Sequence, residues 1–313
     1  MDLSKLFRDY FNKFRDFVHQ RHKLVLPGFE GLPFLDVAGF FFYRLSEGEL
    51  QTRARSLAFS FLLALFPSII FLFTLIPYVP IQDFQNRMLT MLQTLLPAST
   101  YEAARTTIED IILHQNGGLL SFGFFFALFV SADGILAMIK WFNKSFHGKE
   151  TRPAWRVRVM AIALTIMMAI MVTLAIALII GSELLFSYIA EKEILVNFFQ
   201  LFLIHIVRWS ILLGLCFTAI SLLYYFGPAQ KEKMKFISAG SSLATLLIVL
   251  TSIGFNFFVT QFGSYNKVYG SIGTLIIILI WLFINSLVLL VGYELNVSIR
   301  KAGTRKITPL PLQ

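Results

Sequence analysis

Thiols and acidic side chains are scarce in this chain. Its single cysteine, Cys216, lies in an apolar run, which excludes a disulfide framework and a cysteine-based metal site. Of 313 residues only 18 are Asp or Glu, against 27 Lys or Arg, and all charged residues together make up 14%. The first 23 residues are charged throughout and lack an apolar segment, so we expect no cleavable signal peptide.

Residue sets for catalysis are also missing. Metal-dependent hydrolysis needs several His, Asp or Glu side chains gathered around one or two ions. The histidines are scattered, and no HxxxH, HxHxDH or paired-carboxylate spacing occurs. There is no Gly-rich phosphate loop and no Ser/His/Asp arrangement that rises above chance. We therefore predict no catalytic residues, no metal, no cofactor and no enzymatic activity.

Apolar residues dominate the composition. They make up 57% of the chain, and the mean hydropathy is +0.71, which is typical of a polytopic membrane protein. Residues 118–139 are almost wholly apolar and are followed by six Lys or Arg between 140 and 158. This order predicts a membrane span whose far end lies in the cytoplasm. The net charge of +9 collects between apolar runs, which argues against a nucleic-acid partner.

We expect an all-α polytopic membrane protein with six transmembrane helices. The six spans cover residues 57–79, 118–140, 159–181, 203–226, 236–258 and 270–297. The fourth is hard to bound, because residues 194–229 exceed the roughly 20 residues that a span needs. Starts at Leu203 and at Ile194 both fit. Residues 51–300 then form the transmembrane domain, and residues 301–313 form a cytoplasmic tail.

Amphipathic segments are expected outside the spans. Residues 1–50 predict cytoplasmic or interfacial amphipathic helices, since residues 3–18 place apolar and aromatic side chains at steps of three and four. That face suits either the membrane interface or the protein's own cytoplasmic side. The apolar segment 34–45 is too short to span a bilayer. Residues 82–114 predict short outer helices between spans one and two, which could form a lid.

The positions of the basic residues give the topology. Of the 27 Lys and Arg, 22 lie in segments that six spans place on the same side as the termini, and four lie in outer loops. The remaining one, Arg208, lies in the fourth span. This asymmetry predicts that both termini are cytoplasmic.

Several short motifs, in a fixed order, resemble those of the YihY/virulence factor BrkB family of bacterial inner-membrane proteins, once labelled ribonuclease BN. The motifs are Leu57-Ala58-Phe59 through Leu65-Phe66-Pro67, Leu96-Pro97-Ala98, Ser131-Ala132-Asp133-Gly134, Leu223-Tyr224-Tyr225 with Pro228, Tyr265 through Tyr269-Gly270, Trp281, and Gly292-Tyr293-Glu294-Leu295-Asn296. Where the family often has Leu-Asn after the acid of the second span, this chain has Ile135 to Met138. The resemblance spans about residues 54–300 and implies a six-helix protein of the bacterial cytoplasmic membrane, without an established activity.

Asp133 is the most informative candidate residue, because it is the one carboxylate that clearly lies within a span. If that span starts near Gly118, Asp133 lies about 22 Å in, in the inner half. An intramembrane carboxylate normally faces a bundle interior or a water path. One hypothesis is a protonatable or cation-binding site on a solute path. The other is a carboxylate satisfied by neighbouring Ser, Tyr or backbone groups.

Four further residues are candidates. Arg208 could meet Asp133 if the fourth span begins at Ile194, whereas a start at Leu203 makes Glu183 its better partner or lets it snorkel to the interface. Glu294 near the inner end of span six could pair with an arginine, Arg53, Arg55 or Arg300, as a structural clamp. Pro67 is expected to kink the first span, since it removes one backbone hydrogen bond.

Two classes of function remain at this stage. The protein is either a transporter or permease-like protein for an unidentified small solute, or a structural or envelope-interaction protein without a solute path. Its surroundings are the lipid bilayer in both cases. The Phe-rich spans offer large flat faces, which would allow a homo-oligomer.

Overall fold

The computed structural model describes residues 28–46, 49–75, 117–145, 150–191, 198–229, 234–261 and 271–307, with isolated helical positions between 86 and 113. Long helices make up this part of the chain, and the described residues contain no strand. They are α2 (Phe34–Ser46), α3 (Glu49–Leu75), α6 (Gly117–Ser145), α7 (Ala154–Glu191), α8 (Phe198–Phe226), α9 (Ala239–Gln261) and α11 (Ser271–Ile307).

Five of these helices, α6, α7, α8, α9 and α11, are long and apolar enough to cross a membrane. This confirms the expected all-helical membrane protein for the described residues. The count of six spans stays a prediction, because the expected first span (57–79) begins in α3 and runs past Leu75 into residues that are not described. The amphipathic helix at 3–18 and most of the outer helices at 82–114 also lie outside the described residues.

Local signals explain where the helices begin and end. α9 begins after Ser238, whose hydroxyl accepts a hydrogen bond from the Ser241 amide at 3.1 Å, while the Ser238 amide donates to the Ser241 hydroxyl at 3.2 Å. This reciprocal cap satisfies donors that a helix start leaves free. α8 ends at Gly227-Pro228, where the Gly227 amide still donates to the Leu223 carbonyl at 3.0 Å. α3 continues helically on both sides of Pro67.

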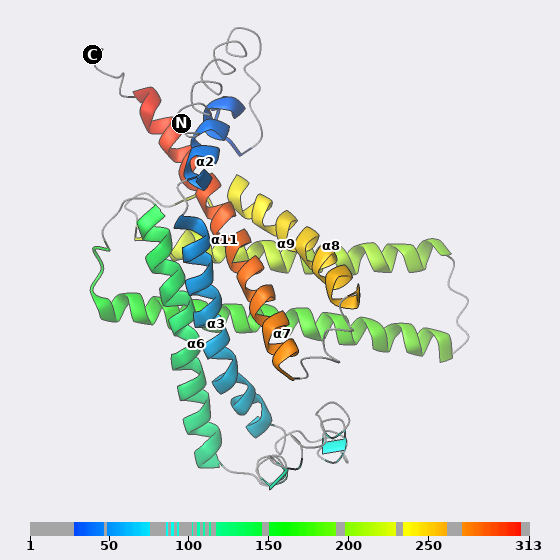
Figure 1. Cartoon of the computed structure of the whole chain (residues 1–313). Coiled ribbons are helices and arrows are strands. Elements are labelled where there is room, and N and C mark those ends of the chain that lie inside the picture. The colour runs from blue at the N-terminus through cyan, green and yellow to red at the C-terminus, as the bar shows by residue number, and fades with distance from the viewer. Residues whose placement is uncertain are drawn as a thin grey trace.

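The helices form pairs that point in different directions (Figure 1). α3 and α6 form one pair of neighbouring helices, and α7 and α8 form a second pair. The second pair crosses the direction of the first in Figure 1. α9 and α11 run obliquely between them, and α11 also contacts α3 and the short helix α2. α7 reaches the rest of the bundle mainly through α6.

Burial is concentrated at one end of the bundle, which we call the packed end. There α6 and α8 finish, α3, α7 and α9 begin, and the middle of α11 passes through. The buried core residues there are Ala54, Leu57, Ala132, Ile135, Met138, Ile139, Phe142, Val157, Ala161, Leu164, Ile220, Leu222, Leu223, Tyr224, Met234, Ala244, Val288, Leu290, Tyr293 and Val297. Three aromatic rings lie at the centre of this core, with the Phe142 ring stacked on Tyr293 at 4.0 Å and both rings edge-on to Tyr224 at 5.6 Å.

Away from the packed end the helices separate and expose large apolar side chains. Phe125 of α6 and Phe257 of α9 are about two-thirds exposed, and Ile176 of α7 is half exposed. The buried share of the candidate spans is at most 33%, in α6, and only 6% in α7. None of them is therefore enclosed by its own chain, and the outer halves must contact the bilayer or another molecule.

A close helix crossing joins α9 to α11 at the packed end. A side chain at Gly292 would place its Cβ 2.6 Å from both the Gly240 carbonyl oxygen and the Tyr224 hydroxyl. A Cβ at Gly240 would lie 2.1 Å from the Gly292 carbonyl oxygen. The Asn296 amide spans the same crossing, because its oxygen accepts from the Gly240 amide at 2.8 Å and its nitrogen donates to Ser238 at 2.9 Å. Only glycine fits at both positions, as in other tight membrane helix pairs.

Replacing Gly292 by Ala should lower the free energy of unfolding by about 1–3 kcal/mol, because the added methyl group overpacks backbone atoms that cannot move aside. Thermal unfolding of the purified protein in detergent measures this. Gly254→Ala on α9 is the matched control, since its Cβ would meet nothing within 4 Å. Equal melting temperatures for the two variants would contradict the close crossing.

Candidate functional site

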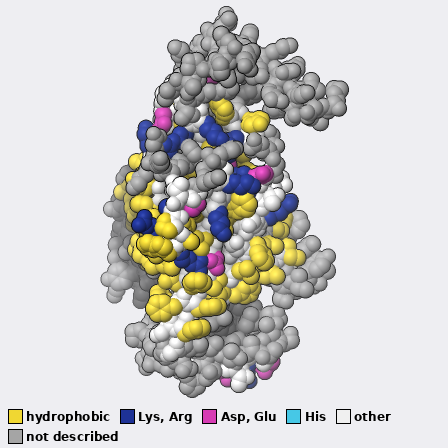
Figure 2. Space-filling view, turned by 90° about the vertical axis from the view of Figure 1, so that its left-hand side faces the viewer, with side chains coloured by type: hydrophobic (Ala, Val, Ile, Leu, Met, Phe, Trp, Pro, Cys, Tyr) yellow, Lys and Arg dark blue, Asp and Glu magenta, His cyan; other side chains and the backbone are white. Residues whose placement is uncertain are grey.

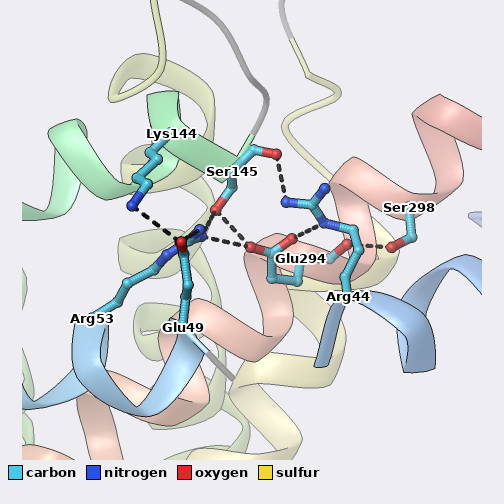
Figure 3. A network of polar contacts seen from close by, with 7 residues as sticks. All are labelled: Arg44, Glu49, Arg53, Lys144, Ser145, Glu294 and Ser298. Atoms are coloured by element: carbon cyan, nitrogen blue, oxygen red, sulfur yellow. Dashed lines mark hydrogen bonds and ion pairs between the residues drawn. The ribbon is translucent and has the colours of Figure 1, made fainter. Parts of the chain in front are cut away.

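A buried group of charged and polar side chains joins four helices at the packed end (Figure 3). We call it the Glu294 cluster; it consists of Arg44, Glu49, Arg53, Lys144, Ser145, Glu294 and Ser298. Glu294 on α11 is 2% exposed, and Arg44 on α2 and Arg53 on α3 are also buried. Charged side chains are seldom this buried unless they are paired.

Both carboxylate oxygens of Glu294 are occupied. Arg44 donates its Nε to Oε2 at 2.5 Å, while the Ser145 hydroxyl at 2.6 Å and Nη1 of Arg53 at 3.2 Å donate to Oε1. Arg44 also donates to the Ser145 main-chain carbonyl at 2.5 Å, which satisfies an acceptor at the last residue of α6. Two guanidinium groups thus hold one carboxylate and one helix end together.

A more exposed ion pair extends the cluster to the protein surface. Glu49, in the first turn of α3, accepts from Nη2 of Arg53 at 2.5 Å and lies 3.1 Å from the Lys144 ammonium. Arg53 and Lys144 lie over the Trp141 ring, 5.7 and 5.3 Å from its centroid. Cation–π contact adds to the charge pairing here. The cluster therefore fixes α2, α3, α6 and α11 to one another through polar contacts as well as apolar packing.

Asp133 forms a second charged site on α6, where it accepts a hydrogen bond from Nη1 of Arg158 on α7. The candidate span of α6 within the described residues, judged by length and composition, is Ser121–Ser145, with Asp133 twelve residues from each end, and Arg158 lies four residues after the start of the candidate span of α7, Ala154–Ile179. The Asp133 side chain is nevertheless 54% exposed, and that of Arg158 is 21% exposed. An unpaired carboxylate at this depth costs roughly 2.5–3.5 kcal/mol, which explains the arginine beside it.

The structure gives Asp133 a partner that the prediction did not name. Asp133 pairs with Arg158, a residue that the sequence showed only as part of a cationic block, whereas the prediction had left open whether Asp133 meets Arg208. α8 itself starts at Phe198, and its candidate span within the described residues is Phe202–Phe226. The choice between span starts at Ile194 and Leu203 stays a prediction, because residues 192–197 lie outside the described residues. The side chain of Glu183 lies outside the described residues.

For Glu294, the prediction gave Arg53, Arg55 and Arg300 as alternatives; the structure pairs Glu294 with Arg53 and also with Arg44, which the prediction did not name. Arg55 is exposed on the surface of α3. Arg44 lies on the short apolar helix α2 and is 250 residues from Glu294 along the chain. No spacing rule could therefore predict that the two side chains meet. The pairing depends on α2 packing against α11, which only the fold reveals.

Several of the short motifs named in the sequence analysis lie at or near the packed end, whereas Leu96-Pro97-Ala98 and Tyr265 to Gly270 lie outside the described residues. Tyr224 donates its hydroxyl to the Leu289 carbonyl at 2.6 Å, one turn before the Gly292-to-Asn296 stretch. Gly134, next to Asp133, lies so close to α3 that a Cβ there would be 2.7 Å from the Phe61 ring. Helix contact and charge pairing therefore give these motif residues a structural role. Among the described residues, no three His, Cys, Asp or Glu side chains gather as a metal site.

Replacing Glu294 by Ala should cost about 3–5 kcal/mol in the free energy of unfolding, because two buried guanidinium groups lose their shared partner. Thermal unfolding in detergent is the measurement. Glu30→Ala is the control, since Glu30 forms an exposed ion pair with Lys235 at 3.2 Å that is worth at most about 1 kcal/mol. A loss for Glu294→Ala no larger than the control's would show that the cluster does not tie the helices together.

The acid stability of the packed end should depend on Glu49. Hydrogen bonds from Arg53 and Lys144 lower the pKa of the Glu49 carboxyl from 4.5 to about 2. A lowered pKa means that its stabilising contribution is present above pH 4.5 and is lost as the pH falls towards 2. The melting temperature of Glu49→Gln should lie slightly below that of the wild type at pH 7, and the gap should close over this pH range. A gap that does not change with pH would contradict the pairing.

Comparison with known proteins places the chain among bacterial membrane proteins. It is 30% identical over 263 residues to the ribonuclease-like protein YfkH of Bacillus subtilis, covering 83% of this chain and 92% of YfkH. It is 28% identical over 260 residues to a UPF0761 membrane protein of Vibrio campbellii, covering 82% of this chain and 79% of that protein. A UPF0761 membrane protein of Haemophilus influenzae is 25% identical over 281 residues, covering 84% and 94%.

No solved structure matches the chain significantly. The sequence profile of the virulence factor BrkB family matches residues 41–312, which include both charged sites and every described helix except part of α2. This match covers most of the 313 residues. The chain therefore belongs to the virulence factor BrkB family.

Proposed function

We propose that the protein is a permease-like membrane protein for a small solute, and not an enzyme, with a solute path that ends at Asp133 and Arg158. The observation that carries this proposal is the half-exposed carboxylate in the middle of an apolar span. Ionisable side chains at this depth commonly mark the paths of substrates, ions or protons. A carboxylate needed only for packing would be expected to lie inside the core, as Glu294 does.

The distribution of packing supports an asymmetric path. Beyond Asp133, toward the packed end, the Glu294 cluster and the stack of Phe142, Tyr224 and Tyr293 would close the bundle. In the other direction large side chains such as Phe125 and Phe257 are exposed, so the proposed path would be reached from that side. Transport to the far side would then require the packed end to open, as alternating access demands.

We assign the packed end to the cytoplasm of a bacterial cell, with both termini on that side. Figure 2 shows a face on which Lys and Arg side chains gather in the upper and middle part of the coloured surface, while its lower part shows mostly apolar side chains and no dense group of Lys and Arg. Membrane proteins retain Lys and Arg preferentially on the cytoplasmic side. The UPF0761 relatives are named membrane proteins of bacteria, which fits the cytoplasmic membrane as the location.

The pair offers one group of each charge sign to a solute. The carboxylate of Asp133 can hold an ammonium group or a proton, and the guanidinium of Arg158 can hold a carboxylate or phosphate. Small zwitterions and small ions are therefore the solutes to test first.

Replacing Asp133 by Asn should reduce transport by at least tenfold without unfolding the protein. Proteoliposomes on a solid-supported membrane would be exposed to concentration jumps of amino acids, phosphate, chloride and sodium and to pH jumps, and the protein-dependent current would be recorded. Glu30→Gln, outside the candidate spans, is the control and should keep wild-type currents. Absence of current for every solute, or full current in Asp133→Asn, would contradict the proposal and favour a structural membrane protein.

A further inference from the structure

One side of α6 carries a continuous exposed surface, which we call the α6 face. It consists of Phe122, Phe126, Phe129 and Asp133, which follow one another at steps of four, three and four residues. This spacing places all four on one side of a helix. Their exposed fractions are 68%, 48%, 54% and 54% in that order. Among the described residues, Arg158 of α7 lies over the Asp133 end of this surface, and the four side chains still remain about half exposed or more.

The aromatic part of the α6 face is flat. The Phe122 and Phe126 rings are stacked with centroids 5.8 Å apart and planes 9° apart, and the Arg158 guanidinium lies 3.6 Å from the Phe129 ring centroid. Aromatic and arginine side chains are enriched where proteins bind one another and are common among the residues that contribute most to binding.

Acyl chains would be a poor cover for this surface. Each Phe could face lipid, but a half-exposed carboxylate in the middle of the span could not do so without a large loss of solvation. The Asp133 carboxylate has acceptor sites beyond the one that Arg158 uses, and the guanidinium has five N–H donors. Among the described residues, Arg158 donates to Asp133 alone. The α6 face thus has unused donors and unused acceptors side by side.

We propose that the α6 face is the interface between two copies of this chain. In a two-fold arrangement the same patch meets itself, so Asp133 of each copy would accept from the partner's Arg158 as well as from its own. Each charge would then have two partners of opposite sign, and the Phe side chains would pack across the two-fold axis. Because the surface carries one negative and one positive group, it is complementary to an identical surface on a second copy. Acyl chains carry no charge and cannot pair with either group.

This inference stands independently of transport. If the proposed solute path also exists, it runs between the two copies. The partner's Arg158 then adds a second guanidinium group to the charged site where the path ends. A dimer without transport would contradict only the proposed function, and transport by a monomer would contradict only the proposed interface. The two proposals can therefore fail separately.

Charge reversal separates pairing between copies from pairing within one chain. Asp133→Arg places two cations on the α6 face, and Arg158→Asp places two anions there, so each variant alone should remain monomeric. When they are produced together with different affinity tags, the two chains should co-purify at the wild-type level, because a cationic face meets an anionic one. A wild-type chain that is monomeric by light scattering in lipid nanodiscs, or mixed variants that do not co-purify, would overturn the proposal.

A second experiment keeps the charged pair intact, in case the reversed variants do not fold. In a Cys216→Ser background, Phe126→Cys should form a cross-linked dimer in membrane vesicles treated with a copper oxidant. Ile253→Cys on α9 is the matched control, because Ile253 is 64% exposed but lies on a different helix. The interface predicts at least tenfold more dimer for Phe126→Cys than for Ile253→Cys. Equal yields from the two positions would overturn it.

Discussion

The interaction of one buried carboxylate with two arginines is the constraint on which the rest of the structure depends. Glu294 receives Arg44 from α2, Arg53 from α3 and the Ser145 hydroxyl from α6, so four helices are fixed at one point. A buried ion pair is weak evidence for stability by itself, because desolvation offsets much of the attraction. Its value here is specificity of assembly, since apolar helices in a bilayer have no hydrophobic drive to choose their neighbours.

Close packing and charge pairing act at the same end of the molecule. The Gly240–Gly292 crossing and the aromatic rings of Phe142, Tyr224 and Tyr293 lie there together with the Glu294 cluster. Toward the other end the helices diverge (Figure 1), and apolar side chains are exposed. The bundle is therefore closely packed at one end and exposes its helices at the other. That division suits a protein that must admit a solute or bind a second copy.

Hydropathy and charge were sufficient to predict an all-helical membrane protein and five of its long apolar helices, because chain length and polarity decide those features locally. Arg53 was one of three arginines that the sequence offered as partners of Glu294, and the structure pairs the two. The roles of Arg44 and Arg158 could not be predicted in the same way. Arg44 depends on α2 folding back onto α11, and Arg158 depends on the crosswise direction of α7, which apolar periodicity does not encode.

What lies against the Asp133–Arg158 pair decides whether this surface has a role beyond helix packing. A cryo-EM structure of the full chain in lipid nanodiscs, at a resolution that shows side chains and ordered water, would reveal what lies against it. We expect two copies related by a two-fold axis, with Asp133 within hydrogen-bond distance of the partner's Arg158 and with the Glu294 cluster intact. A lone copy whose Asp133 and Arg158 are surrounded by acyl chains would contradict this.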